Sequence, residues 1–183
     1  MNIFCVDNDP TVSATQLCDK HVVKMVTETS QMLVSALRRY NCPEHHLPLT
    51  KAGTVSKGGY HHHPSTRWAG DSSANFQWLL MHGKALCREY TKRYKREHFC
   101  EAGIHKMERY WVRYIPFGVK TAFAIAISED MKCRQVSHFN TLSPVVQYRL
   151  YYKLDKSNIA KWIKRPESKP DWYDLPVKEI IKG

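Results

Sequence analysis

The sequence predicts a mainly α-helical fold: a compact single-domain helical bundle with a short extended N-terminal segment and long loops. Apolar residues recur every three or four positions in several windows, as they do on the buried face of a helix. Asp-Pro and Ser-Pro pairs precede two of these windows, and proline is favoured in the first turn of a helix. The length of 183 residues, 43% of them hydrophobic, suits one core, so we expect one domain over residues 1–183.

The N-terminal region predicts a short extended segment followed by a long helix. Residues 2–6 are mostly apolar, Asp9 offers an oxygen to cap a helix, and Pro10 suits its first turn. The helix is expected to end near Tyr40, because Pro43 follows closely. The residues of its buried face are Leu17, Val22, Met25, Val26, Thr29, Leu33, Ala36 and Leu37.

A long loop and a second helix are predicted next. Residues 41–64 hold three prolines, three glycines and five histidines without a sustained period, which is typical of a loop. After Pro64 a helical pattern resumes. Its apolar side carries Phe76, Leu79, Leu80, Gly83, Cys87, Tyr90 and Tyr94, and its basic side carries Lys84, Arg88, Lys92, Lys95 and Arg96.

The remaining pattern is less regular. A third helix is predicted over residues 102–114, before the motif Ile115-Pro116-Phe117-Gly118. Residues 120–140 are ambiguous: the apolar run at 122–127 suits a short helix, coil or a buried strand, and we favour helix or coil.

Two serines indicate where the last helices begin. Ser143, followed by Pro144, predicts a helix that continues to Leu154. Ser157 predicts a final short helix that ends near Ile163. The aromatic tail, residues 165–183, is interrupted by prolines.

The charge balance indicates a nucleic-acid partner. The chain carries 28 Lys and Arg against 17 Asp and Glu, a net charge of +11 with histidine neutral, and a basic surface binds phosphates with release of counterions. No run of 18 apolar residues is present, and the first ten residues lack the features of a signal peptide. We therefore expect a cytoplasmic monomer that binds DNA and no membrane.

The cysteines predict neither disulfides nor a metal site. Six cysteines are scattered without a Cys-x-x-Cys pair, and the chain has no export signal. Zinc is the alternative, because Cys42, His45 and His46 precede His61-His62-His63. This spacing fits no common ligand pattern, so we expect no metal and no cofactor.

The first helix carries the strongest candidate site. His21 and Glu28 are seven residues apart, which places them about 20° apart around the helix axis and two turns apart along it. Two interpretations are open. The carboxylate of Glu28 is half-buried beside the apolar face and suited to catalysis, or it forms a solvated pair with Lys24.

Three motifs occur in the order found in a known family. Asp19-Lys20-His21 is followed after six residues by Glu28, His61-His62-His63-Pro64 leads to the second long helix, and Arg165-Pro166 precedes Asp171-Trp172-Tyr173. This arrangement resembles the phage pyrimidine-dimer DNA glycosylases, the endonuclease V type of glycosylase and abasic-site lyase. The resemblance implies duplex DNA with an extruded base as substrate, in the cytoplasm of an infected host cell.

The resemblance also implies roles for individual residues. An N-terminal amine attacks the sugar C1′ atom, Glu28 moves protons, and His21 contacts sugar or phosphate. Asn2 is bulky enough for Met1 to be retained, so the amine of Met1 is the candidate nucleophile. Further candidates for nucleic-acid binding are Lys20, Lys24, His63 and Arg67.

Two positions differ from the family pattern, and three candidate functions stay open. Thr27 and Gln31 stand where the family has arginines, so two phosphate contacts are missing. The first candidate is a DNA glycosylase with lyase activity. The second is an enzyme that modifies an unusual base or nucleotide on the same scaffold. The third is a DNA-binding protein without catalysis.

Three polar or aromatic residues each have two interpretations. Trp172 and Tyr173 stack on an exposed base, or they attach the tail to the core. Asn75 reads a base, or it caps the second helix.

Overall fold

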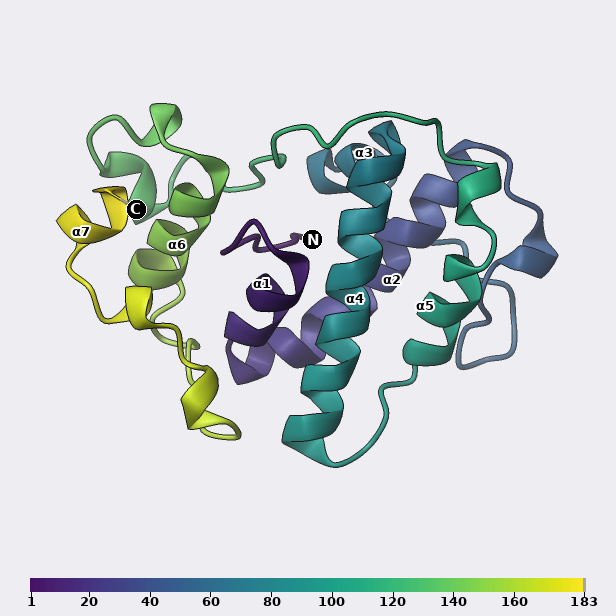
Figure 1. Ribbon diagram of the computed structural model, residues 1–183, viewed down its shortest axis with the longest axis horizontal. Helices are drawn as coiled ribbons and strands as arrows, with labels where there is room; N and C mark the ends of the chain where they lie inside the picture. Colours follow the sequence, from purple (N-terminus) through teal and green to yellow (C-terminus); the bar gives the residue numbers. More distant parts are fainter. Residues whose placement is uncertain (183) are drawn as a thin grey trace.

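The computed structural model describes residues 1–182, and its architecture is mainly α-helical, as predicted (Figure 1). The seven α-helices are α1 (Pro10–Gln16), α2 (Asp19–Arg39), α3 (Pro64–Asp71), α4 (Ser73–Tyr94), α5 (Glu101–Glu108), α6 (Pro144–Asp155) and α7 (Val177–Lys182). No β-strand forms within residues 1–182, where the only pairing of this kind is an isolated bridge between Leu49 and Val55.

The predicted first helix is two helices, α1 and α2, so the expectation of one continuous helix is wrong. Asp9 caps α1 as predicted, but Leu17 and Cys18 adopt extended backbone conformations. Contacts from distant parts of the chain hold this break. The guanidinium of Arg93 donates to the carbonyl of Leu17 (2.8 Å), and the main-chain N–H of Asp19 donates to a carbonyl at residue 161 (2.9 Å).

Helix α2 lies at the centre of the first half of the chain. It packs against α3 and α4, and α4 also packs against α1 (Figure 1). The predicted apolar face of α2 is buried, and Leu33 and Leu37 are fully inaccessible to solvent. Burial of such a side chain contributes about 2 kcal/mol, so this face anchors the helix that carries Glu28.

The helical pattern after the loop is also divided. Ser72 is extended between α3 and α4, and its hydroxyl caps α4 by accepting from the N–H of Asn75 (3.1 Å). The imidazole of His63 caps α3. Helix α5 is shorter than predicted, because it ends at Glu108 and a 3₁₀ turn follows at Trp111–Arg113.

The C-terminal third confirms one predicted helix and corrects another. Ser143 caps α6 as predicted. Residues 122–127 form coil and not a helix. The helix expected after Ser157 is absent from the described structure, where residues 157–163 form turns and coil. Here the main chain bonds to the break before α2, and the indole of Trp162 donates to the carbonyl of Gln16 (3.0 Å). Helix α7 lies in the tail, where the sequence predicted none.

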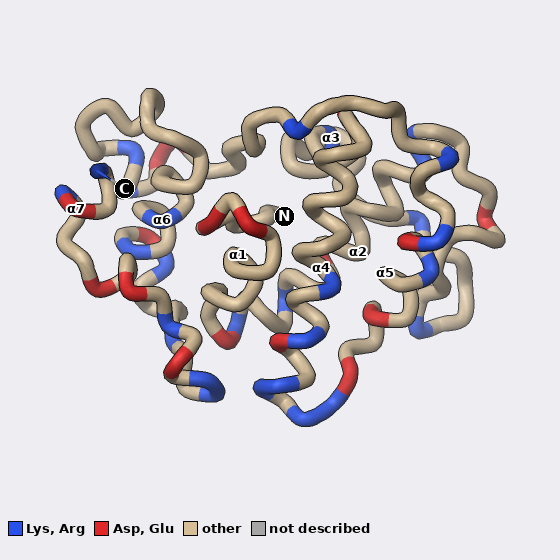
Figure 2. The backbone as a smooth tube through the Cα atoms, in the orientation of Figure 1, with Lys and Arg blue, Asp and Glu red and all other residues tan. Residues whose placement is uncertain are grey.

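Helices from the two halves of the chain lie on different sides of α1. In Figure 1, α2 to α5 lie on one side of α1, and α6 and α7 lie on the other, joined by a green segment that crosses above α3. Buried hydrophobic residues form one cluster that includes members from Ile3 to Ile180. Lysines and arginines gather at the end of α4 and around α6 (Figure 2). Within residues 1–182, every helix is too short or too polar to span a bilayer.

Candidate active site

Glu28 projects from α2 towards the N-terminal segment. Its Oε2 atom accepts a hydrogen bond from the main-chain N–H of Asn2 (2.9 Å), and its Oε1 atom lies 3.2 Å from Nζ of Lys24. The side chain of Glu28 is only 12% exposed, whereas that of Lys24 is 65% exposed. Both interpretations of the sequence therefore hold in part: the ion pair with Lys24 forms, and the carboxylate is buried.

The start of the chain is held firmly beside this carboxylate. The side-chain amide of Asn2 accepts from the N–H groups of Ile3 and Phe4 and donates to the carbonyl of Ala126 (2.9 Å). Phe4 has a φ of 54°, which is rare for an aromatic residue. Such conformations persist where surrounding contacts enforce them, often at functional sites. These contacts direct the N–H of Asn2 at Glu28.

The α-amine of Met1 belongs to the same cluster. Met1 is half-buried, and its sulfur lies 3.5 Å from the hydroxyl of Thr66. Burial lowers the pKa of His63, the positive N-terminus lowers it further, and Glu28 acts in the opposite direction. Met1 directly precedes Asn2, so its amine lies one residue from the main-chain N–H that contacts Glu28.

His21 is buried two helical turns before Glu28 on α2. Its ring stacks on Phe4, with 4.2 Å between centroids, and its Nδ1 atom lies 2.5 Å from the hydroxyl oxygen of Tyr152. Burial, assisted by the charges of Lys156 and Lys24, lowers the pKa of His21 to about 3. The imidazole is therefore neutral at pH 7 and can contact a sugar or phosphate only as a hydrogen-bonding group.

Tyr152 determines which nitrogen of His21 carries the proton. The oxygen of Tyr152 already accepts from the main-chain N–H of Cys18 (3.2 Å), so its own hydrogen has two possible acceptors. The sulfur of Cys18, at 3.5 Å, is a weak acceptor, and Nδ1 of His21 is a strong one at 2.5 Å. We therefore infer that Nδ1 is the unprotonated nitrogen, which leaves Nε2–H as a donor for a ligand. No local pattern in the sequence indicates this pair, because its two members are 131 residues apart.

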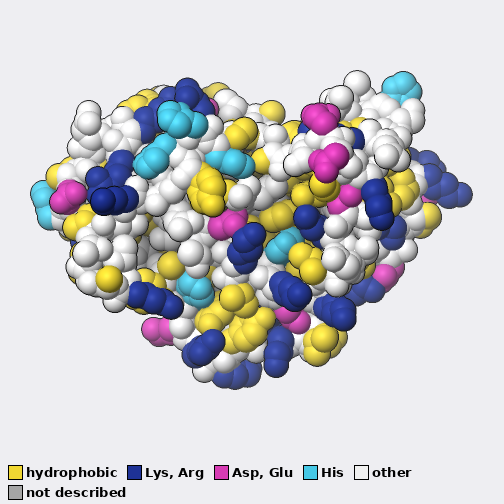
Figure 3. Space-filling view, turned by 180° about the vertical axis from the view of Figure 1, so that it is seen from behind, with side chains coloured by type: hydrophobic (Ala, Val, Ile, Leu, Met, Phe, Trp, Pro, Cys, Tyr) yellow, Lys and Arg dark blue, Asp and Glu magenta, His cyan; other side chains and the backbone are white. Residues whose placement is uncertain are grey.

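The predicted basic residues lie at the surface around the site. Lys20, Lys24 and Arg67 are exposed, and His63 is half-buried. Figure 3 shows one face of the molecule, on which cationic and histidine side chains are spread among apolar ones, with fewer acids. This surface is suited to a polyanion.

Asn75 and Trp172 are buried, unlike the other predicted nucleic-acid contacts. The amide of Asn75 bonds to the carbonyl of Trp68 and to Thr121, and the cap of α4 is Ser72, so the prediction of a cap at Asn75 is wrong. The indole of Trp172 donates to the side chain of Gln16 (2.8 Å). Tyr173 is half-buried next to it. These contacts favour a role for Asn75 and Trp172 in holding the fold, and base contacts by them stay a prediction.

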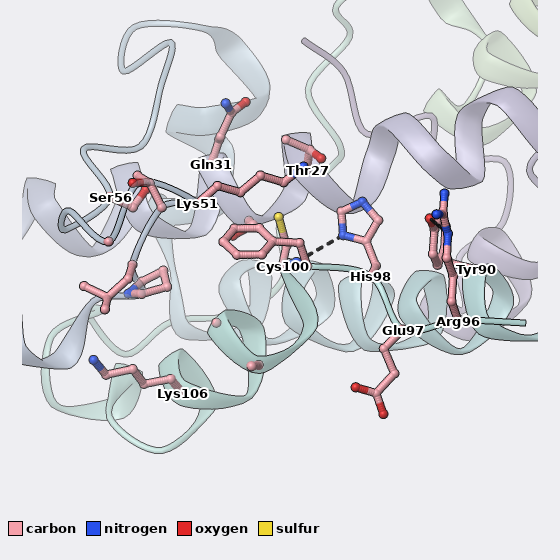
Figure 4. A pocket seen from close by; sticks show the side chains of 18 residues that line it. Thr27, Gln31, Lys51, Ser56, Tyr90, Arg96, Glu97, His98, Cys100 and Lys106 are labelled. Carbon is pink, nitrogen blue, oxygen red and sulfur yellow. Dashed lines mark hydrogen bonds between the residues drawn. The ribbon is translucent and has the colours of Figure 1, made fainter. Parts of the chain in front are cut away.

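A cavity of about 940 Å³ opens beside α2, the helix that carries Glu28 (Figure 4). Its walls are α2, the loop at 48–56 and the segment at 96–106, and Thr27, Ser30 and Gln31 line it from α2, whereas Glu28 does not. Nζ of Lys51 lies 5.6 Å from the ring centre of Phe99. An aromatic face next to cations suits a planar, anionic group such as a nucleotide. Because three separate segments form its walls, no local sequence pattern predicts this cavity.

The Cys/His cluster considered as a zinc site does not assemble. Within residues 1–182, no three His, Cys, Asp or Glu side chains are placed to hold a metal ion. His46 instead stacks on Tyr110 and hydrogen-bonds to Tyr114 (2.7 Å). Cys42 is buried, and burial raises the pKa of its thiol.

Fold and site together define a class of protein: a helical, basic protein that holds a buried carboxylate against its own N-terminal residues. The chain belongs to the pyrimidine dimer DNA glycosylase family, whose model matches residues 1–102. Membership identifies DNA as the class of substrate. No curated protein and no solved structure matched the chain. The matched residues include Met1, His21 and Glu28, whereas Tyr152 and Ala126 lie beyond them.

Proposed function

We propose that the protein is a DNA N-glycosylase with abasic-site lyase activity, in which Glu28 is the acid/base residue and the N-terminal amine is the nucleophile. The observation that carries this proposal is the 2.9 Å contact between Oε2 of Glu28 and the main-chain nitrogen of Asn2. A general base must lie within hydrogen-bond reach of the proton that it moves. This contact supports a role for Glu28 at the start of the chain, where an amine nucleophile would act.

The reaction uses the amine and the carboxylate in turn. The uncharged amine attacks C1′ of the sugar, the bond from C1′ to the base breaks, and the base leaves with the bonding electron pair and takes up a proton. After its attack the amine gives up one of its two protons, the ring oxygen O4′ takes up a proton as the sugar ring opens, and Glu28 stabilises the positive charge on the protonated imine that results. In the lyase step, Glu28 removes a proton from C2′, and the 3′-phosphate departs by β-elimination.

The identity of the N-terminal residue determines which nitrogen reacts. With Met1 retained, its α-amine is the nucleophile, and it lies one residue before the Asn2 nitrogen that contacts Glu28. Loss of Met1 would convert the nitrogen of Asn2, already 2.9 Å from Glu28, into the α-amine. We expect Met1 to be retained, because a side chain as large as that of Asn2 hinders removal of the initiator methionine.

The remaining candidates bind the substrate. Lys20, Lys24, His63 and Arg67 contact phosphates, and Nε2–H of His21 donates to a sugar or phosphate oxygen. The cavity beside Thr27 receives a nucleotide extruded from the duplex, an arrangement common in enzymes that act on a base. One monomer acts on duplex DNA.

A second candidate function is modification of an unusual base. The observation that favours it is the lining of the cavity by Thr27 and Gln31, which are uncharged where the resembling family has arginines. Smaller neutral side chains leave room for a larger base or a second small reactant. In this function Glu28 still moves protons, but no covalent adduct with the amine forms.

Borohydride trapping on abasic duplex DNA tests the proposal. Borohydride reduces the imine, so the wild type is expected to become covalently attached to DNA. Glu28→Gln and the N-terminally acetylated protein are expected to form at least about 100-fold less covalent adduct than the wild type. Glu108→Gln is the matched control, because this carboxylate pairs with Lys84 on the surface (2.6 Å) and is expected to leave trapping unchanged. Turnover by an acetylated protein without any adduct would favour the base-modifying function.

A further inference from the structure

Phe117 is the most exposed large apolar side chain in the part of the chain that the structure describes. It is 99% exposed, and Val119 two residues later is 78% exposed. The flanking residues Ile115 and Phe123 are both buried, at 5% and 6%. The segment therefore inserts its two ends into the core and presents Phe117 to solvent between them.

Hydrogen bonds to the start of α4 hold this segment in place. The N–H of Ser73 donates to the carbonyl of Pro116 (2.8 Å), and the Ser73 hydroxyl bonds to both the N–H and the carbonyl of Gly118 (3.1 and 3.2 Å). The hydroxyl of Ser72 donates to the carbonyl of Val119 (2.8 Å). A Cβ atom on Gly118 would lie 3.0 Å from Cβ of Ser72, so the backbones meet closely. Phe117 is thus displayed on a fixed backbone.

The charge around Phe117 favours a polyanion as its partner. Residues 109–128 contain no Asp or Glu, and they include the exposed cations Arg109, Arg113 and Lys120. None of these three cations forms an ion pair within residues 1–182. An exposed aromatic ring between unpaired cations matches a stack of bases between phosphates.

The segment lies within reach of the candidate active site. Helix α3 has His63 at its start and Ser72 after its end, and its eight residues span about 12 Å, or three to four base pairs. Arg67 is exposed between these two ends. Further along the same segment, the carbonyl of Ala126 accepts from the side chain of Asn2. One duplex can therefore contact Phe117, Arg67 and the N-terminal residues together.

We propose that Phe117 is a wedge that inserts between stacked bases of duplex DNA, while Arg113 and Lys120 contact the adjacent phosphates. An inserted apolar side chain unstacks a base step and kinks the duplex, which lowers the cost of extruding a nucleotide nearby. This inference rests on the proposed function for its partner, and it adds a DNA contact outside the residues matched by the family.

The test compares Phe117→Ala with Phe117→Trp and with the control Leu175→Ala, an exposed apolar residue of the tail at 42%. The probe is an abasic duplex with 2-aminopurine at the neighbouring base step, whose fluorescence rises on unstacking. Phe117→Ala is expected to bind about 10-fold more weakly and to lose the fluorescence rise. Phe117→Trp and Leu175→Ala are expected to retain both, and all variants are expected to melt like the wild type.

The salt dependence of DNA affinity distinguishes the contribution of the Phe117 ring from that of the neighbouring cations. Phe117→Ala removes no cation, so the negative slope of log affinity against log salt is expected to stay constant, whereas Lys120→Gln is expected to reduce the magnitude of this slope by about 0.9. If the wild type binds and traps abasic DNA and Phe117→Ala does the same with full fluorescence, the wedge is wrong and the glycosylase proposal stands. Loss of self-association in Phe117→Ala, in place of loss of DNA binding, would also overturn the wedge. Absence of wild-type DNA binding at low salt overturns both.

Discussion

Residues 1–102 and residues 103–182 contribute in different ways to one site. The first region carries Met1, His21 and Glu28, and it is the region that the family model matches. The second region carries Tyr152 and Ala126, which hold His21 and Asn2 in place through hydrogen bonds. The groups proposed to react therefore come from one region, and the contacts that orient them come partly from the other.

Arg93 tests whether the two regions depend on each other. Its guanidinium is fully buried, bonds to the carbonyls of Thr15 and Leu17 and to Asp19, and reaches Ser168 of the second region (2.9 Å). Arg93→Met leaves buried acceptors without a partner and is expected to lower the free energy of unfolding by about 3 kcal/mol. Urea denaturation measures this.

The matched control for Arg93 is Lys92→Met on the same helix, where the side chain is 58% exposed. It is expected to change stability by less than about 0.5 kcal/mol. Equal stabilities of the two variants would contradict the view that buried contacts of Arg93 tie the regions together.

The second prediction concerns stability against pH. His82 is fully buried and both of its ring nitrogens lack hydrogen-bond partners within the described residues, and burial lowers its pKa to about 3. Since the unfolded chain binds the proton near pH 6.5, stability is complete above that pH and is lost as the pH falls towards 3. The loss for His82 is expected to be about 2 kcal/mol between pH 6 and pH 4.

The pKa of His21 is also lowered to about 3, so a variant is needed to distinguish its contribution to the pH dependence of stability from that of His82. His82→Phe keeps a ring against Trp78, which stacks on His82 at 5.0 Å, and removes the titrating group. Between pH 6 and pH 4, the free energy of unfolding of the variant is expected to decrease less than that of the wild type, and the difference between the two decreases is about 2 kcal/mol. An unchanged pH profile would mean that His82 is not the group that titrates.

Tyr152 provides the most specific test of the second region. Tyr152→Phe removes the hydroxyl that bonds to His21 and is expected to reduce kcat/KM by about 5- to 10-fold, which corresponds to one hydrogen bond. In ¹⁵N NMR spectra, Nδ1 of His21 in the wild type is expected to be unprotonated, and the variant is expected to show a mixture of tautomers.

Tyr151→Phe is the control for Tyr152. Tyr151 lies on the other side of Phe4, at 5.9 Å between ring centres, and its hydroxyl makes no hydrogen bond within residues 1–182. It is expected to retain wild-type activity and a single tautomer. A protonated Nδ1 in the wild type would contradict the orientation inferred for His21.

Local signals in the sequence predicted much of the fold. Asp9 with Pro10 and Ser143 with Pro144 begin helices where expected, because a cap depends only on neighbouring residues. The break at Leu17 was missed, since it depends on Arg93, 76 residues away in sequence. The helix expected after Ser157 is absent for a similar reason: local main-chain bonds close only turns between Lys156 and Lys161, and the carbonyl of Lys161 accepts from the N–H of Asp19 at the break.

The candidate site also has some features that local sequence predicts and others that depend on distant contacts. The seven-residue spacing of His21 and Glu28 is a local feature of one helix, so the sequence placed both on one edge. The N-terminal contact to Glu28 and the bond from Tyr152 join distant segments, and no periodicity encodes them. The cavity beside Thr27 was missed for this reason too, because three separate segments form its walls.

Peptide mapping of the borohydride-trapped adduct tests most directly whether the N-terminal amine reacts beside Glu28. Lys24 is the competing amine, since its Nζ atom lies 3.2 Å from the same carboxylate. Mass spectrometry of the digested adduct is expected to find the reduced sugar on the α-amine of Met1 and to leave Lys24 unmodified. A sugar on Lys24, or no adduct from a protein that turns over its DNA substrate, would contradict the claim.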